Sequence, residues 1–246
     1  MRYSLAADEL HLWYCPLQEL PETEEQTRLY VSEEEQERLA RIRAEESRVL
    51  ALRVRASVRR IVSGYAGCSA RELPIVRTPA GKPLLGEPYA ALKFNLAHSG
   101  SWLGVAVAWQ REIGIDLERV RRDDPEYRLR LARRFFHPQE SEALSRLPPA
   151  RIAAGFFTSW VRKEAYIKCW GGTIAQHSQR FALTVDPEQP AERVSAHWQE
   201  GQDTKVSIQD VWAPLGFCAA VVLSGSLPPL LRRRFWPADA ERAESL

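Results

Sequence analysis

Two carboxylates stand two residues apart in the segment Gly114-Ile115-Asp116-Leu117-Glu118. The apolar residues around them predict a β-strand, from which Asp116 and Glu118 project on one face while Ile115 and Leu117 face the core. Neighbouring carboxylates repel each other unless a cation lies between them. Hard oxygen ligands without histidine or cysteine suit Mg²⁺ that is bound together with substrate phosphates. Taken alone, the segment is therefore either an ordinary exposed strand end or a magnesium site.

A second group of chemically active side chains lies in residues 156–168, which contain no glycine or proline and predict a helix. Trp160, Glu164 and Lys168 recur every four residues, so they share one helix face. The helix thus presents a carboxylate and an ammonium together, either as an exposed ion pair or as part of a polar site. Upstream, His98 is either a phosphate ligand or a structural histidine.

The elements that must position these groups follow from hydrophobic periodicity and from the placement of glycine and proline. Helices are predicted over about 32–65, 125–147 and 149–170, and strands over about 102–109, 181–185, 205–212 and 217–223. The apolar runs 103–108 and 217–222 look alike, as a short internal repeat would. This mixture of helices and strands predicts an α/β chain.

Four arginines are spaced seven, seven and four residues apart on a continuous helix predicted over about 41–65, which places them in a narrow stripe. They are Arg41, Arg48, Arg55 and Arg59. The opposite side is apolar and is predicted to face the core: Leu50, Val54, Val58, Ile61 and Tyr65. The arginine face is either solvated or in contact with phosphates, which need several cationic donors.

The composition is that of a globular protein, with 246 residues, 45% hydrophobic and 27% charged. A net charge of +2 does not indicate a nucleic-acid or membrane-surface partner. Four widely separated cysteines without a C-x-x-C pair argue against a zinc site and a disulfide scaffold, and favour the reducing cytoplasm. No apolar stretch predicts a signal peptide or a membrane span.

Three short motifs carry a resemblance to a known family. They are Phe94-Asn95-Leu96-Ala97-His98-Ser99, then Gly114–Glu118, then the W-x-x-K-E-A-x-x-K pattern that begins at Trp160. In this order they resemble the 4'-phosphopantetheinyl transferase superfamily, in particular the larger type that activates nonribosomal peptide and polyketide synthases. Gly81-Lys82-Pro83 and Arg133-Arg134-Phe135-Phe136 with Glu140 add to the resemblance, which covers about residues 40–185.

The resemblance implies an α/β (α+β) fold of two similar subdomains related by a pseudo-twofold axis. The subdomains are expected over residues 1–109 and 110–246, with the crossover near 110–112. A cleft between such halves is a favoured place for a ligand. Because a pseudo-twofold within one chain mimics a dimer interface, a monomer is expected.

The resemblance also implies a reaction: the 4'-phosphopantetheine arm of coenzyme A passes to a serine hydroxyl of an apo acyl or peptidyl carrier protein, and 3',5'-ADP is released. The implied ligands of Mg²⁺, with Mn²⁺ as the alternative metal, are Asp116, Glu118 and Glu164. The implied catalytic residues are Asp116, Glu164 and Lys168, and the implied coenzyme A ligands are Arg48, Arg55, Lys82, His98, Lys163 and Lys168. The serine proton passes either to Glu164 or to a metal-bound water.

The chain departs from the family pattern at two positions. Thr173 stands where the family has the second glycine of G-x-G-L, and Ala97 stands where a serine is common. Loss of the glycine is expected to alter the loop if its backbone needs a positive φ. Elsewhere, residues 232–246 are predicted to be a solvated tail, and Trp198, Trp212 and Trp236 are predicted to be buried.

Two other functional classes fit parts of this pattern. A different Mg²⁺-dependent phosphotransferase or nuclease would act on nucleotides without coenzyme A or a carrier protein. A non-catalytic module would bind carrier proteins or other anionic partners through the arginine face, without metal. Carrier proteins are typically acidic helical bundles, so a transferase is expected to have a basic, partly apolar docking face.

Overall fold

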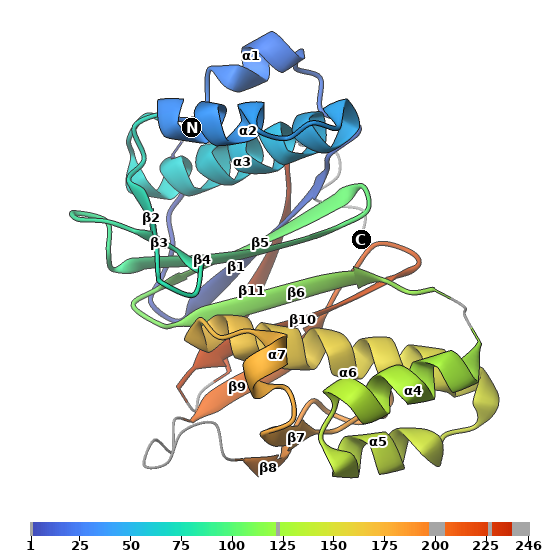
Figure 1. Cartoon of the computed structure of the whole chain (residues 1–246). Coiled ribbons are helices and arrows are strands. Elements are labelled where there is room, and N and C mark those ends of the chain that lie inside the picture. The colour runs from blue at the N-terminus through green and yellow to red at the C-terminus, as the bar shows by residue number, and fades with distance from the viewer. Residues whose placement is uncertain (1, 122–123, 197–204, 226–227, 238–246) are drawn as a thin grey trace. The chain divides into compact units, whose positions relative to one another are not determined.

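The computed structural model describes residues 2–121, 124–196, 205–225 and 228–237. The chain forms two compact units, and Figure 1 labels the elements of each. The first unit consists of Met1–Arg77, Pro83–Gln110 and Leu230–Leu246, and the second of Thr78–Lys82 and Arg111–Pro229. The change of unit after Gln110 lies next to the boundary predicted at 109. Assigning all of 110–246 to the second half is wrong, because the strand that begins at Leu230 pairs within the first unit.

The first unit is built on a four-stranded sheet in the order β11-β1-β5-β4. The apolar strand β5 (Trp102–Trp109) lies inside the sheet, antiparallel to β1 (Glu9–Pro16) and to β4 (Leu92–Ser99). Strand β11 (Leu230–Phe235) pairs with β1 in parallel. The prediction of a solvated tail is therefore wrong for residues 232–235, which belong to the sheet. A short hairpin is formed by β2 (Ile75–Arg77) and β3 (Pro83–Leu85).

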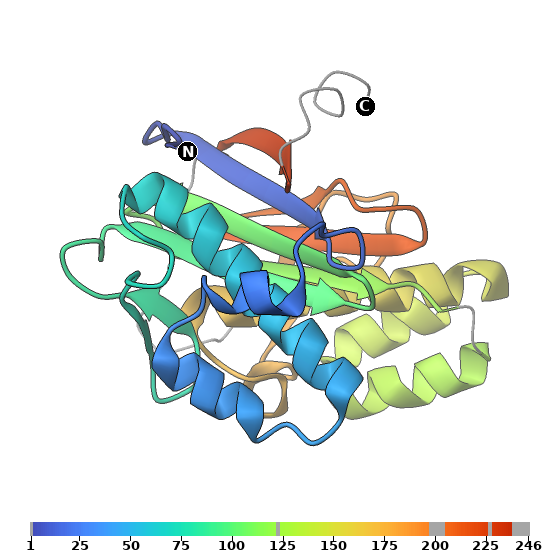
Figure 2. The ribbon, with the colours of Figure 1, turned by 90° about the horizontal axis from the view of Figure 1, so that it is seen from above.

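Helices cover this sheet on one side. They are α1 (Glu24–Arg28), α2 (Glu33–Ala40) and α3 (Glu45–Ala66). Figures 1 and 2 show that the long helix α3 crosses over strands β4 and β5. Its apolar face packs against the sheet, with Val54, Val58 and Ile61 in the same buried cluster as Phe94 and Val105. The predicted core face of this helix is confirmed.

The helix predicted over 32–65 is two helices, because the chain leaves helical geometry between Ala40 and Glu45. The turn lets Ile42 pack against the buried cluster that contains Leu39 and Leu52. The new helix then begins with two glutamates, whose charges are favourable at a helix N-terminus. Arg41 is the C-cap of α2 and so does not belong to a stripe on α3.

Arg59 also departs from the predicted arginine stripe, because its side chain is buried. It forms an ion pair with Glu35. Its Nη1 donates to the main-chain oxygens of Ala70, Arg71 and Leu73 at 2.8, 3.2 and 3.0 Å. Arg59 therefore holds the turn after α3 and is not available to a ligand.

The second unit has a three-stranded sheet in the order β6-β10-β9. The central strand β10 (Phe217–Ser224) is antiparallel to β6 (Ile113–Arg119) and to β9 (Val206–Val211). Helix α6 (Pro149–Trp170) confirms the helix predicted over 149–170 and runs along β6 and β10 (Figure 1). No helix in the part of the chain that the structure describes is long and apolar enough to cross a membrane.

The other elements of the second unit are α4 (Pro125–Phe135), α5 (Pro138–Ser145), α7 (Ile174–His177), β7 (Phe181–Leu183) and β8 (Arg193–Ala196). The helix predicted over 125–147 is split into α4 and α5. Phe136 is extended, and the His137 side chain caps α5 by accepting from the backbone N–H of Gln139. Pro138 then occupies the first helical position, where its missing N–H costs nothing.

The two apolar runs that look alike in the sequence occupy the same kind of position in their own sheets. β5 and β10 are each flanked on both sides by antiparallel strands. A long helix, α3 in the first unit and α6 in the second, packs against each sheet. The predicted mixed α/β class is confirmed.

Of the three tryptophans predicted to be buried, Trp236 is 9% exposed and belongs to the core cluster of the first unit. Trp212 is half-buried in the second unit. Trp198 lies outside the described residues. The prediction is therefore confirmed for Trp236.

Candidate active site

The face of β6 that carries the acidic pair is covered by α6. Strand alternation puts Gly114, Asp116 and Glu118 on the same face. A Cβ atom on Gly114 would lie 2.0 Å from the main-chain oxygen of Ala165 and 2.4 Å from the nitrogen of Cys169. Only glycine permits this approach, so it fixes α6 directly beside the two carboxylates.

Lys168 of α6 meets the acidic pair. Its Nζ lies 2.6 Å from Oδ1 of Asp116, whose side chain is almost fully buried. Burial lowers the pKa of Lys168, but the charge of Asp116 and the hydrogen bond to it, with the charges of Glu164 and Glu118, outweigh burial and raise it. The lysine therefore stays charged.

Glu164 completes the group. Burial raises the pKa of Glu164 to about 7, repulsion from Asp116 and Glu118 acts in the same direction, and Lys168 opposes both. Three acids and one ammonium from β6 and α6 are thus within electrostatic reach of one another. The predicted proximity is seen directly for Lys168 and Asp116, whose side chains are in contact.

The side chains of this acidic cluster suit a hard divalent cation, since they are carboxylates without histidine or cysteine. Oδ2 of Asp116 is buried and has no hydrogen-bond partner among the described residues. In the described ranges, however, no three His, Cys, Asp or Glu side chains are close enough together to hold one ion. The residue types fit Mg²⁺, and in this geometry the ammonium of Lys168 supplies the positive charge beside Asp116.

A pocket in the first unit brings together two of the predicted coenzyme A ligands. Arg55 of α3 and His98 of β4 line a cavity of about 270 Å³. Arg77, at the end of β2, lines it as well. Sequence reasoning missed Arg77, although it closely precedes the Gly81-Lys82-Pro83 motif. Burial lowers the pKa of the Arg55 guanidinium, whose Nη1 donates to the oxygen of Ala51.

Arg48 does not line this pocket. Its guanidinium lies 4.0 Å from the carboxylate of Glu45 in the first turn of the same helix. Arg48 and Arg55 are two turns apart on α3, yet only Arg55 contributes to the cavity wall. The sequence-based prediction that both act together is therefore not supported by the geometry of the pocket.

Two predicted phosphate ligands are held by protein groups in this structure. Lys163 is fully buried, and its Nζ lies 2.7 Å from Glu140 Oε2 and 2.7 Å from the oxygen of Phe181. The Nζ of Lys82 lies 2.7 Å from Glu112 Oε2 and 2.6 Å from the oxygen of Cys169. Both ammonium groups stabilise the second unit, because buried charges need such partners.

The threonine that departs from the family pattern causes no strain. Thr173 is extended, with φ −128° and ψ 151°, which any residue can adopt. The left-handed conformation is needed two residues earlier, at Gly171, where φ is 73°. The positive φ under which the missing glycine was expected to alter the loop is therefore not present at Thr173.

A cavity of the second unit adjoins the acidic cluster, because Glu118 lines it. Its volume is about 200 Å³, and Arg121 and Arg128 also line it. The floor is apolar: Leu131, Phe135, Phe156, Phe157 and Trp160. The Arg128 guanidinium lies 4.5 Å from the ring centre of Phe157. Sequence reasoning missed these arginines, which follow the D-x-E pair directly and on the next helix.

Comparisons with known proteins agree with this arrangement. The family model described as "4'-phosphopantetheinyl transferase superfamily" matches residues 112–220, and the model "4'-phosphopantetheinyl transferase, N-terminal" matches residues 20–110. The 4'-phosphopantetheinyl transferase HetI of Nostoc is 36% identical, over 78% of this chain and 81% of the relative. A putative 4'-phosphopantetheinyl transferase of Synechocystis is 32% identical, over 94% of this chain and 96% of the relative.

One solved structure is similar over part of the chain. A holo-(acyl-carrier-protein) synthase from Bacillus anthracis, in complex with CoA (3',5'-ADP), covers 47% of this chain and 96% of its own length at 18% identity, with a TM-score of 0.38. The assignment rests on the sequence comparisons, which span both units. Together they show that the chain belongs to the 4'-phosphopantetheinyl transferase superfamily.

Proposed function

We propose that this protein transfers the 4'-phosphopantetheine group of coenzyme A to a serine hydroxyl of an apo acyl or peptidyl carrier protein, with release of 3',5'-ADP. The observation that supports this proposal most directly is the cluster of Asp116, Glu164 and Lys168 on β6 and α6 in a chain of this family. Phosphoryl transfer requires positioned charge more than covalent help from the protein. The cluster supplies such charge on two rigid elements.

Asp116, Glu118 and Glu164 are the residues proposed to hold Mg²⁺, with Mn²⁺ as the alternative. A bound divalent ion would neutralise charge on the coenzyme A pyrophosphate. Lys168 contributes a second positive charge at the same carboxylates, since its ammonium already lies at Asp116. Gly114 keeps α6, which carries Glu164 and Lys168, close to β6, which carries Asp116 and Glu118.

The carrier serine must lose its proton as it attacks. Glu164 is the protein group proposed to accept it, because it lies one helical turn from Lys168 on the same face of α6. A water molecule is the rival acceptor. Glu164→Gln keeps the shape of the side chain and removes the acceptor, so it tests the two roles of Glu164 together.

The pocket of Arg55, Arg77 and His98 is proposed to hold an anionic part of coenzyme A. Arg55→Ala and His98→Ala are each expected to raise KM for coenzyme A by about tenfold or more with little change in kcat, as expected when a hydrogen bond to a charged group is lost. Arg48→Ala is the matched control, because Arg48 lies on the same helix outside the pocket. Equal effects of all three variants would remove this assignment.

The cavity beside Glu118 is proposed to receive the carrier protein. Arg121 and the aromatic floor give it the basic, partly apolar character that an acidic helical partner requires. Arg121→Glu should raise KM for the carrier and leave KM for coenzyme A unchanged. Arg146→Glu, an exposed charge reversal at the C-cap of α5 in the same unit, is the control. No change with Arg121→Glu would move the docking face elsewhere.

We also propose that the protein acts as a monomer in the reducing cytoplasm. The buried free thiols of Cys15 and Cys169 support a reducing compartment, and the two units within one chain support a monomer. Light scattering of the purified chain measures the oligomeric state, and a dimer mass would overturn the proposal.

The test of the main proposal is the intact mass of apo acyl and peptidyl carrier proteins after incubation with this protein, coenzyme A and Mg²⁺, with a chelator control. A chelator-sensitive gain of one phosphopantetheine arm on serine is the expected result. Nucleotide turnover without a carrier would favour a different phosphotransferase. Carrier binding without any gain in mass would favour a non-catalytic module.

A further inference from the structure

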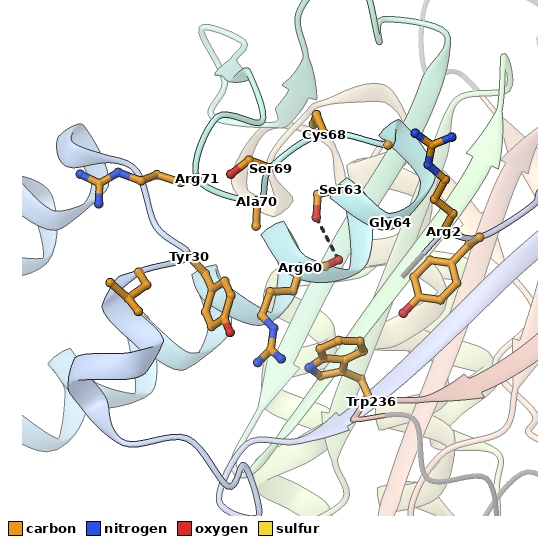
Figure 3. Close-up of a pocket in the computed structure, with 13 residues that line it drawn as sticks. Arg2, Tyr30, Arg60, Ser63, Gly64, Cys68, Ser69, Ala70, Arg71 and Trp236 are labelled. Carbon is orange, nitrogen blue, oxygen red and sulfur yellow. Dashed lines mark hydrogen bonds between the residues drawn. The ribbon is translucent and has the colours of Figure 1, made fainter.

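A pocket that none of the family motifs lines lies wholly within the first unit (Figure 3). Its volume is about 610 Å³, against about 270 Å³ for the pocket of Arg55. Small-molecule sites typically measure about 300–1,000 Å³. The wall is made by residues 2–3 and 29–30, by the segment 60–71 at the end of α3 and in the turn after it, and by Trp236. Four segments distant in sequence thus converge on a cavity of ligand size.

The wall is basic, and no acidic residue is among the described residues that line it. Its charged side chains are Arg2, Arg60 and Arg71. A guanidinium donates hydrogen bonds and accepts none, so these residues favour acceptor oxygens on a ligand. The pocket is therefore suited to an anion.

Arg60 is fixed between two aromatic rings, as Figure 3 shows. Its guanidinium carbon lies 4.3 Å from the ring centre of Tyr30 and 4.7 Å from that of Trp236. Rings on both faces and an ion pair with Glu22 hold this side chain in place. The wall consequently presents flat aromatic surfaces, which favour a planar group.

The indole of Trp236 carries a donor without an acceptor. Trp236 is 9% exposed, and its Nε1 is buried with no hydrogen-bond partner in the described part of the chain. Buried polar groups in folded proteins nearly always have a partner. An acceptor oxygen on a bound molecule would satisfy this N–H.

The arginines differ in how far their charge is already compensated. Arg71 pairs with Glu33 at 3.0 Å, but the Glu33 side chain is 85% exposed, and exposed pairs of this kind are weak. Arg2 forms no ion pair with any described residue. Arg71 and Arg2 can therefore turn toward an anion at small cost, while Arg60 remains part of the wall.

The surroundings of Tyr3 support a positive potential in this pocket. Burial raises the pKa of the Tyr3 hydroxyl, while the charges of Arg234 and Arg60 act in the opposite direction. Arg234 lies behind the wall, with its guanidinium carbon 5.9 Å from the centre of the Tyr3 ring. Arg234 thus adds positive charge to that of the three arginines in the wall.

We propose that this pocket binds a small planar organic anion, an aromatic ring that carries a phosphate or carboxylate group. The ring lies against the aromatic surfaces at Tyr30 and Trp236, and the anionic oxygens meet Arg2, Arg71 and the indole N–H. This site is separate from the residues proposed for coenzyme A and metal binding.

The test is isothermal titration of the full chain with 1-naphthyl phosphate and with 1-naphthoate, in saturating coenzyme A so that the coenzyme A pocket is filled. Saturable binding at one site is expected. Inorganic phosphate lacks the aromatic ring, and neutral naphthalenemethanol lacks the anionic group. Each should therefore bind at least about tenfold more weakly. The phosphate and carboxylate arms identify the preferred anion. No saturable binding of either aromatic anion would overturn the proposal.

Exposed arginines give variants that keep the fold. Arg2→Met and Arg71→Met should each weaken binding of the better anion by about tenfold and leave the neutral ring unaffected. Arg28→Met is the matched control, since Arg28 pairs with Glu24 on α1 and does not line the pocket. The Arg2→Met and Arg71→Met proteins should still modify carrier protein. A loss of anion binding is therefore distinguishable from a loss of the proposed transferase activity. Equal affinities for Arg28→Met and Arg71→Met would contradict the site.

The indole N–H provides a second readout. The chain has eight tryptophans. The variant Trp236→Phe assigns the ¹⁵N-indole resonance of Trp236, because that resonance is missing from its spectrum. The aromatic anion should shift this resonance and leave that of the exposed Trp109 unchanged. Saturable binding that leaves the Trp236 resonance in place would show that the ligand lies elsewhere and would overturn the proposal.

Discussion

The ammonium of Lys168 lies 2.6 Å from Oδ1 of Asp116, while Oδ2 of the same carboxylate has no hydrogen-bond partner in the described residues. This pair joins α6 to β6. The charges of Glu164 and Glu118 also raise the pKa of Lys168, so three carboxylates act on one ammonium. The balance of charge is negative, which favours a further cation at the free oxygen of Asp116.

Neutral isosteric variants of this cluster should lose activity. Asp116→Asn, Glu164→Gln and Lys168→Met are each expected to lower kcat/KM for carrier modification on the order of 100-fold or more, because each removes one positioned charge. Circular dichroism should show an unchanged fold. Arg146→Met, which removes an exposed charge of the same unit, serves as the control. Normal rates in all three variants would show that the reaction uses another site.

Gly114→Ala should disturb both stability and activity. The new Cβ would meet main-chain atoms of Ala165 and Cys169 at 2.0 and 2.4 Å, which α6 can relieve only by moving away from β6. Overpacking of this kind costs about 1–3 kcal/mol or more, and the movement separates Lys168 from Asp116. Urea unfolding and carrier modification measure the two effects.

Gly86→Ala is the control for Gly114→Ala, because its Cβ would meet only ordinary contacts from 3.6 Å upward. It should remain as stable and active as the parent chain. If Gly114→Ala behaved in the same way, α6 would not need its close approach to β6.

The sequence predicted the acidic cluster because its determinants are local. Alternation along β6 places Asp116 and Glu118 together, and the four-residue repeat on α6 places Glu164 and Lys168 together. Lys163 shares the motif but not that face. Its partner Glu140 comes from a different helix, and the spacing of residues on α6 does not identify that partner.

Long-range pairing explains the larger errors. Arg232 of β11 and Glu9 of β1 form a hydrogen bond although they are 223 positions apart. A run such as 230–235, with three arginines in succession, lacks the apolar pattern of a strand, so only its parallel pairing with β1 reveals it. Arg59 is similar, because its acceptors lie in a turn that the helix pattern does not specify.

Glu140 and Lys163 should contribute to stability as a buried pair. Burial raises the pKa of Glu140 and lowers that of Lys163, and each charge opposes the shift of the other. Glu140→Ala leaves the ammonium without a counter-charge and should cost about 3–5 kcal/mol of unfolding free energy. The double variant Glu140→Leu with Lys163→Met should recover most of this loss. Urea unfolding measures both values.

The exposed pair of Glu142 and Arg146 on α5 is the matched control for this prediction. Glu142→Ala should cost at most about 1 kcal/mol, because solvent screens exposed ion pairs. If Glu140→Ala cost no more than Glu142→Ala, the buried pair would not be coupled to the fold of the second unit.

His11 should make stability fall in mild acid. Its ring is buried, with Nδ1 2.6 Å from the Tyr65 hydroxyl and Nε2 3.1 Å from Glu9 Oε2. The Tyr65 hydroxyl also accepts from the indole of Trp13, which favours a neutral His11 whose Nε2–H donates to Glu9. Burial lowers the pKa of His11 below its ordinary 6.5; the charges of Arg234 and Arg232 add to this, and Glu9 opposes it.

The sign of this effect follows from linkage. Above pH 6.5 both the folded and the unfolded chain carry a neutral His11. Below that pH the unfolded chain takes up a proton before the folded chain does, so the unfolding free energy decreases until the folded pKa is reached. Urea unfolding between pH 7.5 and about pH 5 should therefore show a smaller loss for His11→Asn than for the parent chain. Glu9→Gln should enlarge the loss, because it removes the carboxylate that helps His11 keep a proton. Identical pH profiles for the parent and His11→Asn would show that His11 titrates alike in both states.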